Sequence, residues 1–130
     1  TSVLVSALLS AHGPPARVFE LVLSGKVQLL VDDRILDEYR EVLRRPKFGF
    51  DAEDVAALLA YLEGATEWVS ASSSGLALAD PDDPPFVETA IAGKADALVT
   101  GNLRHFPSSK LPPGLLVISP AAFLARWADL

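Results

Sequence analysis

Residues 27–46 read VQLLVDDRILDEYREVLRRP, and the spacing between apolar residues changes once along this stretch. Val27 to Val31 is a short, nearly continuous apolar run, which is typical of a buried strand in a parallel sheet. From Asp33 to Arg45 the apolar positions follow helical spacing, and Pro46 stands where the helix must end. The stretch therefore predicts a strand followed at once by an amphipathic helix.

The same alternation continues on both sides of this unit. An apolar segment, residues 3–9, opens the chain and ends at the breakers of residues 12–15. Further helices are predicted at residues 16–24, 51–63, 83–94 and 120–128, and further strands at residues 66–70, 97–100 and 115–119. Strands that alternate with helices indicate an α/β domain with a parallel sheet and helices on both faces.

Composition narrows the functional classes. The chain has 130 residues, of which 50% are hydrophobic and 22% charged, so we expect one ordered domain. It has no cysteine, which excludes disulfides, thiolate nucleophiles and zinc–thiolate sites, and only two histidines. No apolar run is long enough to span a bilayer and no basic region precedes the first apolar segment, so we expect a soluble, cytoplasmic protein without membrane contact.

The net charge of −6 argues against a generally basic surface for nucleic acid. An acidic protein can still act on phosphates when a bound cation inverts the local field. Composition alone therefore makes a metal ion close to a requirement for nucleic-acid chemistry.

Carboxylates and amides follow several of the predicted strands, where ligands bind in open parallel sheets. Glu38 lies at the edge of its helix's apolar stripe and can turn inward, although a solvated boundary glutamate has the same pattern. Asp80, Asp82 and Asp83 form a repelling cluster that a cation or a helix N-terminus would relieve, so Asp83 as a helix cap is the alternative. Thr100 and Asn102 flank Gly101 after a strand, where an ordinary turn is equally natural.

These segments together resemble the PIN-domain family. The similarity rests on TSVLVSALL at residues 1–9, ILDEY at 35–39, RRPKF at 44–48, DPDD at 80–83 and LVTGN at 98–102. It is closest to the branch described as toxin components of toxin–antitoxin systems (VapC-like ribonucleases). The resemblance implies a Rossmann-like three-layer fold and a Mg²⁺- or Mn²⁺-dependent ribonuclease that an antitoxin neutralises. RNA, an antitoxin protein and, as one assembly, a homodimer are the partners that it implies.

The resemblance also assigns site residues. It implies that Glu38 and Asp83 match two of the usual four acids, that Asn102 stands in place of a third, and that Asp80 supplements them as a metal ligand. The residues expected on the substrate side are Thr1, Ser2, Thr100, Arg44 and Arg45. The family's first acid would stand directly before Thr1, at the end of an apolar central strand. We therefore expect residues 1–130 to be a PIN domain that is incomplete at its N-terminus.

Three functions remain in competition at this stage. The first is the ribonuclease toxin, and the second is a catalytically impaired PIN-like module that binds RNA or protein, which the asparagine at position 102 favours. The third, a receiver-like domain, is ranked last because no suitable lysine stands near residues 115–119. The basic residues Arg44, Arg45 and Lys47 could hold RNA phosphates or an acidic antitoxin segment, or simply complement the helix dipole.

Overall fold

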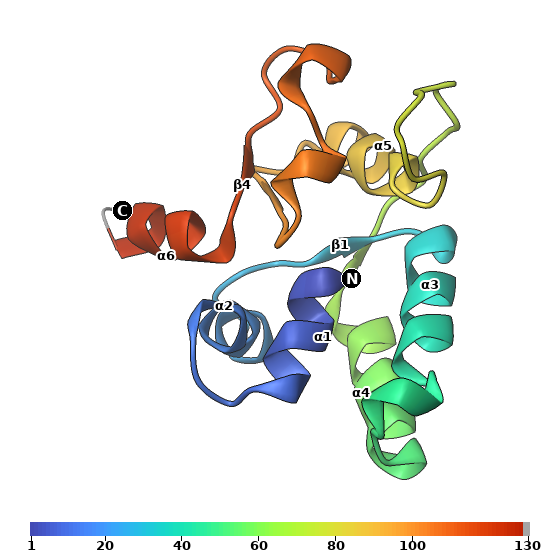
Figure 1. The fold of residues 1–130 in the computed structure, drawn as a ribbon, viewed down its shortest axis with the longest axis vertical. Helices are drawn as coiled ribbons and strands as arrows, with labels where there is room; N and C mark the ends of the chain where they lie inside the picture. Colours follow the sequence, from blue (N-terminus) through green and yellow to red (C-terminus); the bar gives the residue numbers. More distant parts are fainter. Residues whose placement is uncertain (129–130) are drawn as a thin grey trace.

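The computed structural model describes residues 1–128 and contains short parallel strands among helices (Figure 1). The helices are α1 (Ser2–Leu9), α2 (Pro14–Leu23), α3 (Asp33–Leu43), α4 (Ala52–Ala65), α5 (Pro84–Ala92) and α6 (Pro120–Ala128). The strands are β1 (Leu30–Val31), β2 (Glu67–Trp68), β3 (Leu98–Val99) and β4 (Val117–Ile118). Every helix and strand predicted from the sequence is found, but each strand is shorter than its apolar run.

Helix α3 shows why the deciding stretch folds as it does. Asp32 precedes the helix, and its carboxylate accepts a hydrogen bond from the backbone N–H of Ile35. This cap satisfies one of the free amides of the first turn. The apolar stripe is buried as predicted, with Leu36 and Leu43 almost fully enclosed.

The strands pair in parallel, as expected, but they do not form one sheet. Leu30 and Val31 of β1 pair with β2, whereas Leu98 and Val99 of β3 pair with β4. Among the described residues these are two separate two-stranded sheets. The parallel pairing agrees with the predicted α/β fold, but a three-layer arrangement around one sheet is not found in residues 1–128.

The main core lies where α1, α3 and α4 meet. Its buried side chains come from these three helices and from Val31 at the end of β1. Helix α5 contacts both β1 and β3, so it joins the two sheets from one side. Helix α2 packs against both α1 and α6, which places the closing helix beside α2 (Figure 1).

Some structure was not anticipated. The opening apolar segment is a helix, α1, and short 3₁₀ turns occur at Pro46–Phe48, Leu103–His105 and Ser108–Lys110. None of the helices in residues 1–128 combines the length and the apolar character that crossing a membrane requires.

Candidate metal centre

Glu38 lies beside the amino end of α1. The hydroxyl of Thr1 donates a hydrogen bond to Oε1 of Glu38 at 2.7 Å, across 37 positions of sequence. Burial raises the pKa of Glu38 above its ordinary value, and the nearby charges of Asp82 and Asp83 act in the same direction. Glu38 therefore turns toward the acidic segment, as its position at the edge of the stripe allowed.

Asp83 does not cap α5 with its side chain. It occupies the position before the helix, but its carboxylate makes no capping hydrogen bond. Instead Oδ2 of Asp83 accepts from Nδ1 of His105 at 2.9 Å. The interpretation of Asp83 as a helix cap is wrong, because the side chain points to the turn that follows β3.

Asp80 completes a small cluster with these two residues. One possible ligand atom from each of Asp80, Asp83 and His105 lies within 4.8 Å of the others. Desolvation and the charge of Asp80 raise the pKa of Asp83, while the contact with His105 acts in the opposite direction. Asp80 also accepts from the backbone N–H of Asp82 at 2.8 Å, which shapes the turn before α5. His105 is the member that the sequence did not reveal, since a single histidine in a loop carries no pattern.

The segment after β3 closes the other side of the site. The backbone N–H of Gly101 donates to Oγ of Ser2 at 3.2 Å, and the N–H of Asn102 donates to Oγ1 of Thr100 at 3.0 Å. A Cβ on Gly101 would lie 3.4 Å from Oγ of Ser2, which is ordinary van der Waals contact. Ser2 is thus in contact with the turn at residues 100–102, although the two segments are 99 positions apart.

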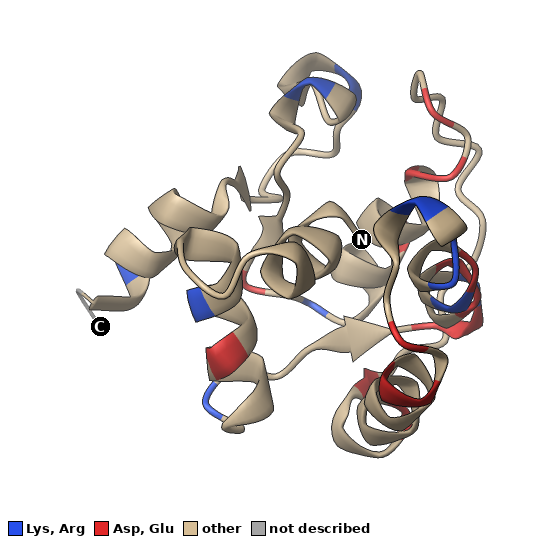
Figure 2. Cartoon of the chain, turned by 60° about the horizontal axis from the view of Figure 1, so that its bottom comes forward, with Lys and Arg blue, Asp and Glu red and all other residues tan. Residues whose placement is uncertain are grey.

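The basic residues do not form one open patch. Arg45 pairs with Glu41 on the exposed face of α3, and Arg40 pairs with Asp37 and Glu63. Within residues 1–128, Arg44 and Lys47 form no ion pair. Figure 2 shows lysine and arginine positions spread over several helices and loops. Arg44 is therefore freer than Arg45 to meet a phosphate.

A buried polar network underlies the site and was not anticipated. Nη1 of Arg34 donates to Glu88 at 2.6 Å, and Nη2 of Arg34 lies 2.7 Å from Oδ2 of Asp32. Glu88 also accepts from the backbone N–H and the hydroxyl of Ser74. Burial raises the pKa of Glu88, but the hydrogen bonds from Ser74 and Arg34 outweigh it, so the pKa lies below its ordinary value. The network fixes the loop before α5 to the first turn of α3.

A family model described as "PIN domain" matches residues 1–104, four-fifths of the chain. The chain belongs to the PIN-domain family. PIN domains are generally nucleases that use divalent metals and act on nucleic acid, so the family supports a nuclease-type function in general. Comparison with curated proteins and comparison with solved structures gave no match.

The residues of this PIN domain fit a divalent cation. Two carboxylates with a pKa raised by burial and by neighbouring acids, Glu38 and Asp83, flank the amino end of α1. A cation among them would relieve this repulsion, and carboxylate oxygens are the ligands that Mg²⁺ and Mn²⁺ prefer. The contact of His105 with Asp83 is of the kind that orients a ligating carboxylate.

Proposed function

We propose that this PIN domain is a metal-dependent endoribonuclease of the toxin type, neutralised by an antitoxin protein. The observation that supports the proposal is the group of Asp80, Asp83 and His105, together with Glu38 beside Thr1, where the charge of Asp83 helps to raise the pKa of Glu38, within a chain of this family. Glu38 comes from a segment that is far from Asp80 and Asp83 in the sequence. Surface acids without a shared role would have no need to lie near one another.

In this proposal Glu38, Asp83 and Asp80 hold Mg²⁺ or Mn²⁺. A bound ion of this kind supplies a water of lowered pKa and neutralises charge that develops on the phosphate. Asp83 keeps its orientation through His105, and the hydroxyl of Thr1 orients Glu38. Asn102 offers a neutral carbonyl oxygen in place of a further carboxylate. Ser2 and Thr100 lie next to this group, and Arg44 and Arg45 at the end of α3 would contact RNA phosphates.

The test is cleavage of single-stranded RNA by the purified protein with Mn²⁺. Because mutation of even outer-shell partners of a metal costs 10–100-fold, Glu38→Gln and Asp83→Asn should each lower the rate by about 100-fold or more. Asp37→Asn is the matched control, since Asp37 neighbours Glu38 but lies exposed on the other face of α3. Cleavage that persists in both acid variants would show a contaminating nuclease or a misplaced site.

A PIN-like binding module that has lost catalysis is the second candidate. It is favoured by Asn102, which supplies no charge where an acid is expected. This candidate predicts RNA or antitoxin binding without cleavage by the unmodified protein. Asn102→Asp separates the two functions, since it should hold or raise the rate of an active enzyme and leave a pure binding module inactive.

A further inference from the structure

Two buried carboxylates share one guanidinium where α3 meets α5. Nη1 of Arg34 donates to Oε1 of Glu88 at 2.6 Å, and Nε of Arg34 donates to Oδ2 of Asp32 at 2.8 Å. Asp32 and Glu88 are only 5% and 6% exposed. We call Asp32, Arg34, Glu88 and the bound Ser74 the Arg34 network. None of its members is a candidate metal ligand.

Stability alone does not account for the Arg34 network. Taking carboxylates out of water costs free energy that their pairing must offset, and apolar side chains of similar volume often stabilise a fold equally well. A guanidinium offers something that apolar side chains lack, because its planar fork fixes the direction and the distance of the carboxylates that it binds. The network is therefore suited to setting the geometry between the elements that it joins.

Both helices that the Arg34 network joins carry candidate metal ligands. Arg34 and Glu38 are four positions apart on α3, and residues at this spacing are neighbours on a helix surface. At the start of α5, the N–H of Phe86 donates to the carbonyl of Asp83 at 3.1 Å. The N–H of Asp83 in turn donates to the carbonyl of Asp80 at 3.2 Å. The two aspartates are thus held to α5, as the glutamate is held to α3.

The loop that leads to the two aspartates is tied to the same network. Oε2 of Glu88 accepts from the backbone N–H of Ser74 at 2.5 Å and from its hydroxyl at 2.6 Å. Residues 69–83 contain no helix or strand, so this loop depends on such contacts to keep one conformation. Ser74 stands six positions before Asp80. Glu88 therefore holds both α3 and the approach to the acidic segment.

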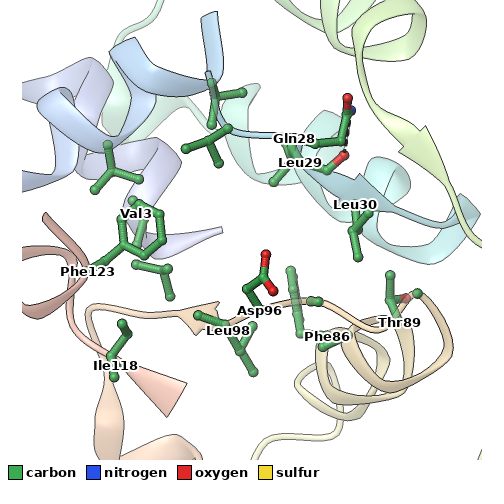
Figure 3. A pocket seen from close by; sticks show the side chains of 18 of the residues that line it. Val3, Gln28, Leu29, Leu30, Phe86, Thr89, Asp96, Leu98, Ile118 and Phe123 are labelled. Carbon is green, nitrogen blue, oxygen red and sulfur yellow. Dashed lines mark hydrogen bonds between the residues drawn. The ribbon is translucent and has the colours of Figure 1, made fainter. Parts of the chain in front are cut away.

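The rest of the surroundings of α5 constrain it less. Within residues 1–128, no other hydrogen bond or ion pair joins α3 to α5. Phe86 and Thr89 border an open cavity of about 930 Å³ that Leu30 also lines (Figure 3). Glu88 does not line this cavity and binds Arg34 instead. Since atoms that border a cavity lack packing partners on that side, the polar contacts of α5 carry more of its positioning.

We propose that Arg34 and Glu88 are positioning residues that set the separation of Glu38 from Asp80 and Asp83. The inference rests on the proposed function, since it takes these three acids to hold the cation. Mg²⁺ demands near-ideal geometry and short bonds, whereas Ca²⁺ accepts longer bonds and variable geometry. A fixed separation of the acids therefore favours Mg²⁺ over Ca²⁺, and the Arg34 network determines this preference.

Isothermal titration with Mg²⁺ and with Ca²⁺ tests the proposal on Arg34→Lys, which keeps the charge but loses the fork. All proteins are compared at a temperature at which circular dichroism shows them folded. The affinity for Mg²⁺ should fall by about 10-fold, the lower end of the effect of losing an orienting partner. The affinity for Ca²⁺ should fall by less than about 3-fold. Val55→Ala, in the core of α4, lowers stability alone and should leave both affinities unchanged.

Ser74→Ala provides a milder variant in case Arg34→Lys fails to fold. It removes one of the two hydrogen bonds from Ser74 and leaves the ion pair of Arg34 with Glu88 in place. The affinity for Mg²⁺ should fall by about 3-fold, because the bond from the backbone N–H remains. Ser74→Thr keeps the hydroxyl and should retain the original affinity.

The absence of cysteine from the chain allows a second measurement without metal. Spin labels on Glu41→Cys in α3 and Ala92→Cys in α5, both exposed positions, report the distance between the two helices by pulsed electron paramagnetic resonance. The distribution of this distance should become broader when Arg34→Lys is added. It should keep its width when Val55→Ala is added.

The outcomes separate this inference from the proposed function. Unchanged Mg²⁺ affinity in Arg34→Lys and Ser74→Ala would overturn the positioning role and leave the metal-dependent nuclease intact. Equal losses for Mg²⁺ and Ca²⁺, or a distance distribution that Arg34→Lys leaves unchanged, would also overturn it, because the helices would then be held by other contacts. Failure of the unmodified protein to bind Mg²⁺ would overturn both proposals.

Discussion

At the scale of single residues, the contact between His105 and Asp83 has the clearest chemical meaning. Because a carboxylate only accepts, Nδ1 of His105 carries the proton in this contact. This contact holds the carboxylate of Asp83 toward Asp80, so that one carboxylate oxygen from each residue can bind the same cation. His105 thus acts on the site through Asp83.

Removal of this contact should weaken metal binding. His105→Ala is expected to lower the affinity for Mn²⁺ by about 10-fold, the lower end of the effect of losing an orienting partner. Isothermal titration with Mn²⁺ measures it. His12→Ala is the control, since His12 is exposed and its backbone N–H and C=O bond with the hydroxyl of Ser10. Unchanged affinity in His105→Ala would show that Asp83 needs no orienting partner or that the cation binds elsewhere.

Glu88 makes stability depend on pH. Its folded-state pKa lies below the ordinary value of 4.5, so the folded protein favours the ionised form. The resulting stabilisation is fully present above about pH 4.5, and is lost as the pH falls through the lower folded-state pKa. Asp32 and Ser74 share this network, so the loss would loosen the segment between β2 and α5.

Glu88→Gln should reproduce that loss at neutral pH. We expect the free energy of unfolding at pH 7 to fall by about 2 kcal/mol, because charge-assisted hydrogen bonds from Arg34 and Ser74 are weakened. Urea denaturation at pH 7 and at pH 3 measures the effect, and the difference from the unmodified protein should shrink at pH 3. Glu41→Gln removes an exposed acid from α3 and should leave the free energy of unfolding almost unchanged. A pH-independent effect of Glu88→Gln would assign its role to packing.

At the scale of helices and strands, an element could be predicted from the sequence where a few neighbouring residues carry its pattern. The stripe of α3 and the cap of α4, where Asp51 accepts from Glu53 and Asp54, are both readable within a few residues. Helix α1 could not be predicted from the sequence because its eight residues are mostly apolar and show only a weak amphipathic period. Each strand is shorter than its apolar run because it pairs with its one neighbour over only two residues, and the length of that pairing cannot be predicted from the run alone.

Two glycines offer a matched test of how α5 docks. Gly93 ends α5, where an added Cβ would lie 2.7 Å from Cδ1 of Leu30 and 3.2 Å from the carbonyl oxygen of Thr89. Gly93→Ala should therefore cost about 1–2 kcal/mol of stability through overpacking. Gly64 lies within α4 with nothing inside 4 Å, so Gly64→Ala should stabilise the protein by about 0.5–1 kcal/mol. Urea denaturation measures both, and a neutral Gly93→Ala would mean that α5 does not pack tightly against β1.

At the scale of the whole molecule, charge limits how RNA can be held. The chain has 11 basic and 17 acidic residues, and three of its arginines are engaged in ion pairs within residues 1–128. The acidic half of the candidate site could be predicted because DPDD is contiguous. That Glu38 and Asp83 belong to one site follows only from the resemblance to the family, and the approach of His105 could not be predicted, since it depends on how distant segments pack.

RNA binding should accordingly depend weakly on salt. We expect log K to fall with log[salt] with a slope no steeper than about −3, as for roughly four phosphates on a single strand. Fluorescence anisotropy with Glu38→Gln and Mg²⁺ measures binding without cleavage. Arg44→Ala should make the slope shallower by about 0.7, whereas Arg17→Ala, exposed on α2, should leave it unchanged. A slope near −7 would contradict this expectation and show that a much larger basic surface contacts the RNA phosphates.

The contact of Ser2 with Gly101 spans 99 positions of sequence and has a consequence for synthesis. A nascent chain that has emerged only as far as α4 carries Glu38 and Thr1, but neither Asp83 nor His105. Non-local contacts of this kind form late, since loop closure must precede them. The growing polypeptide therefore lacks some residues of the candidate metal centre for most of its synthesis. Any hydrolytic capacity would arise only after nearly the whole domain has left the ribosome.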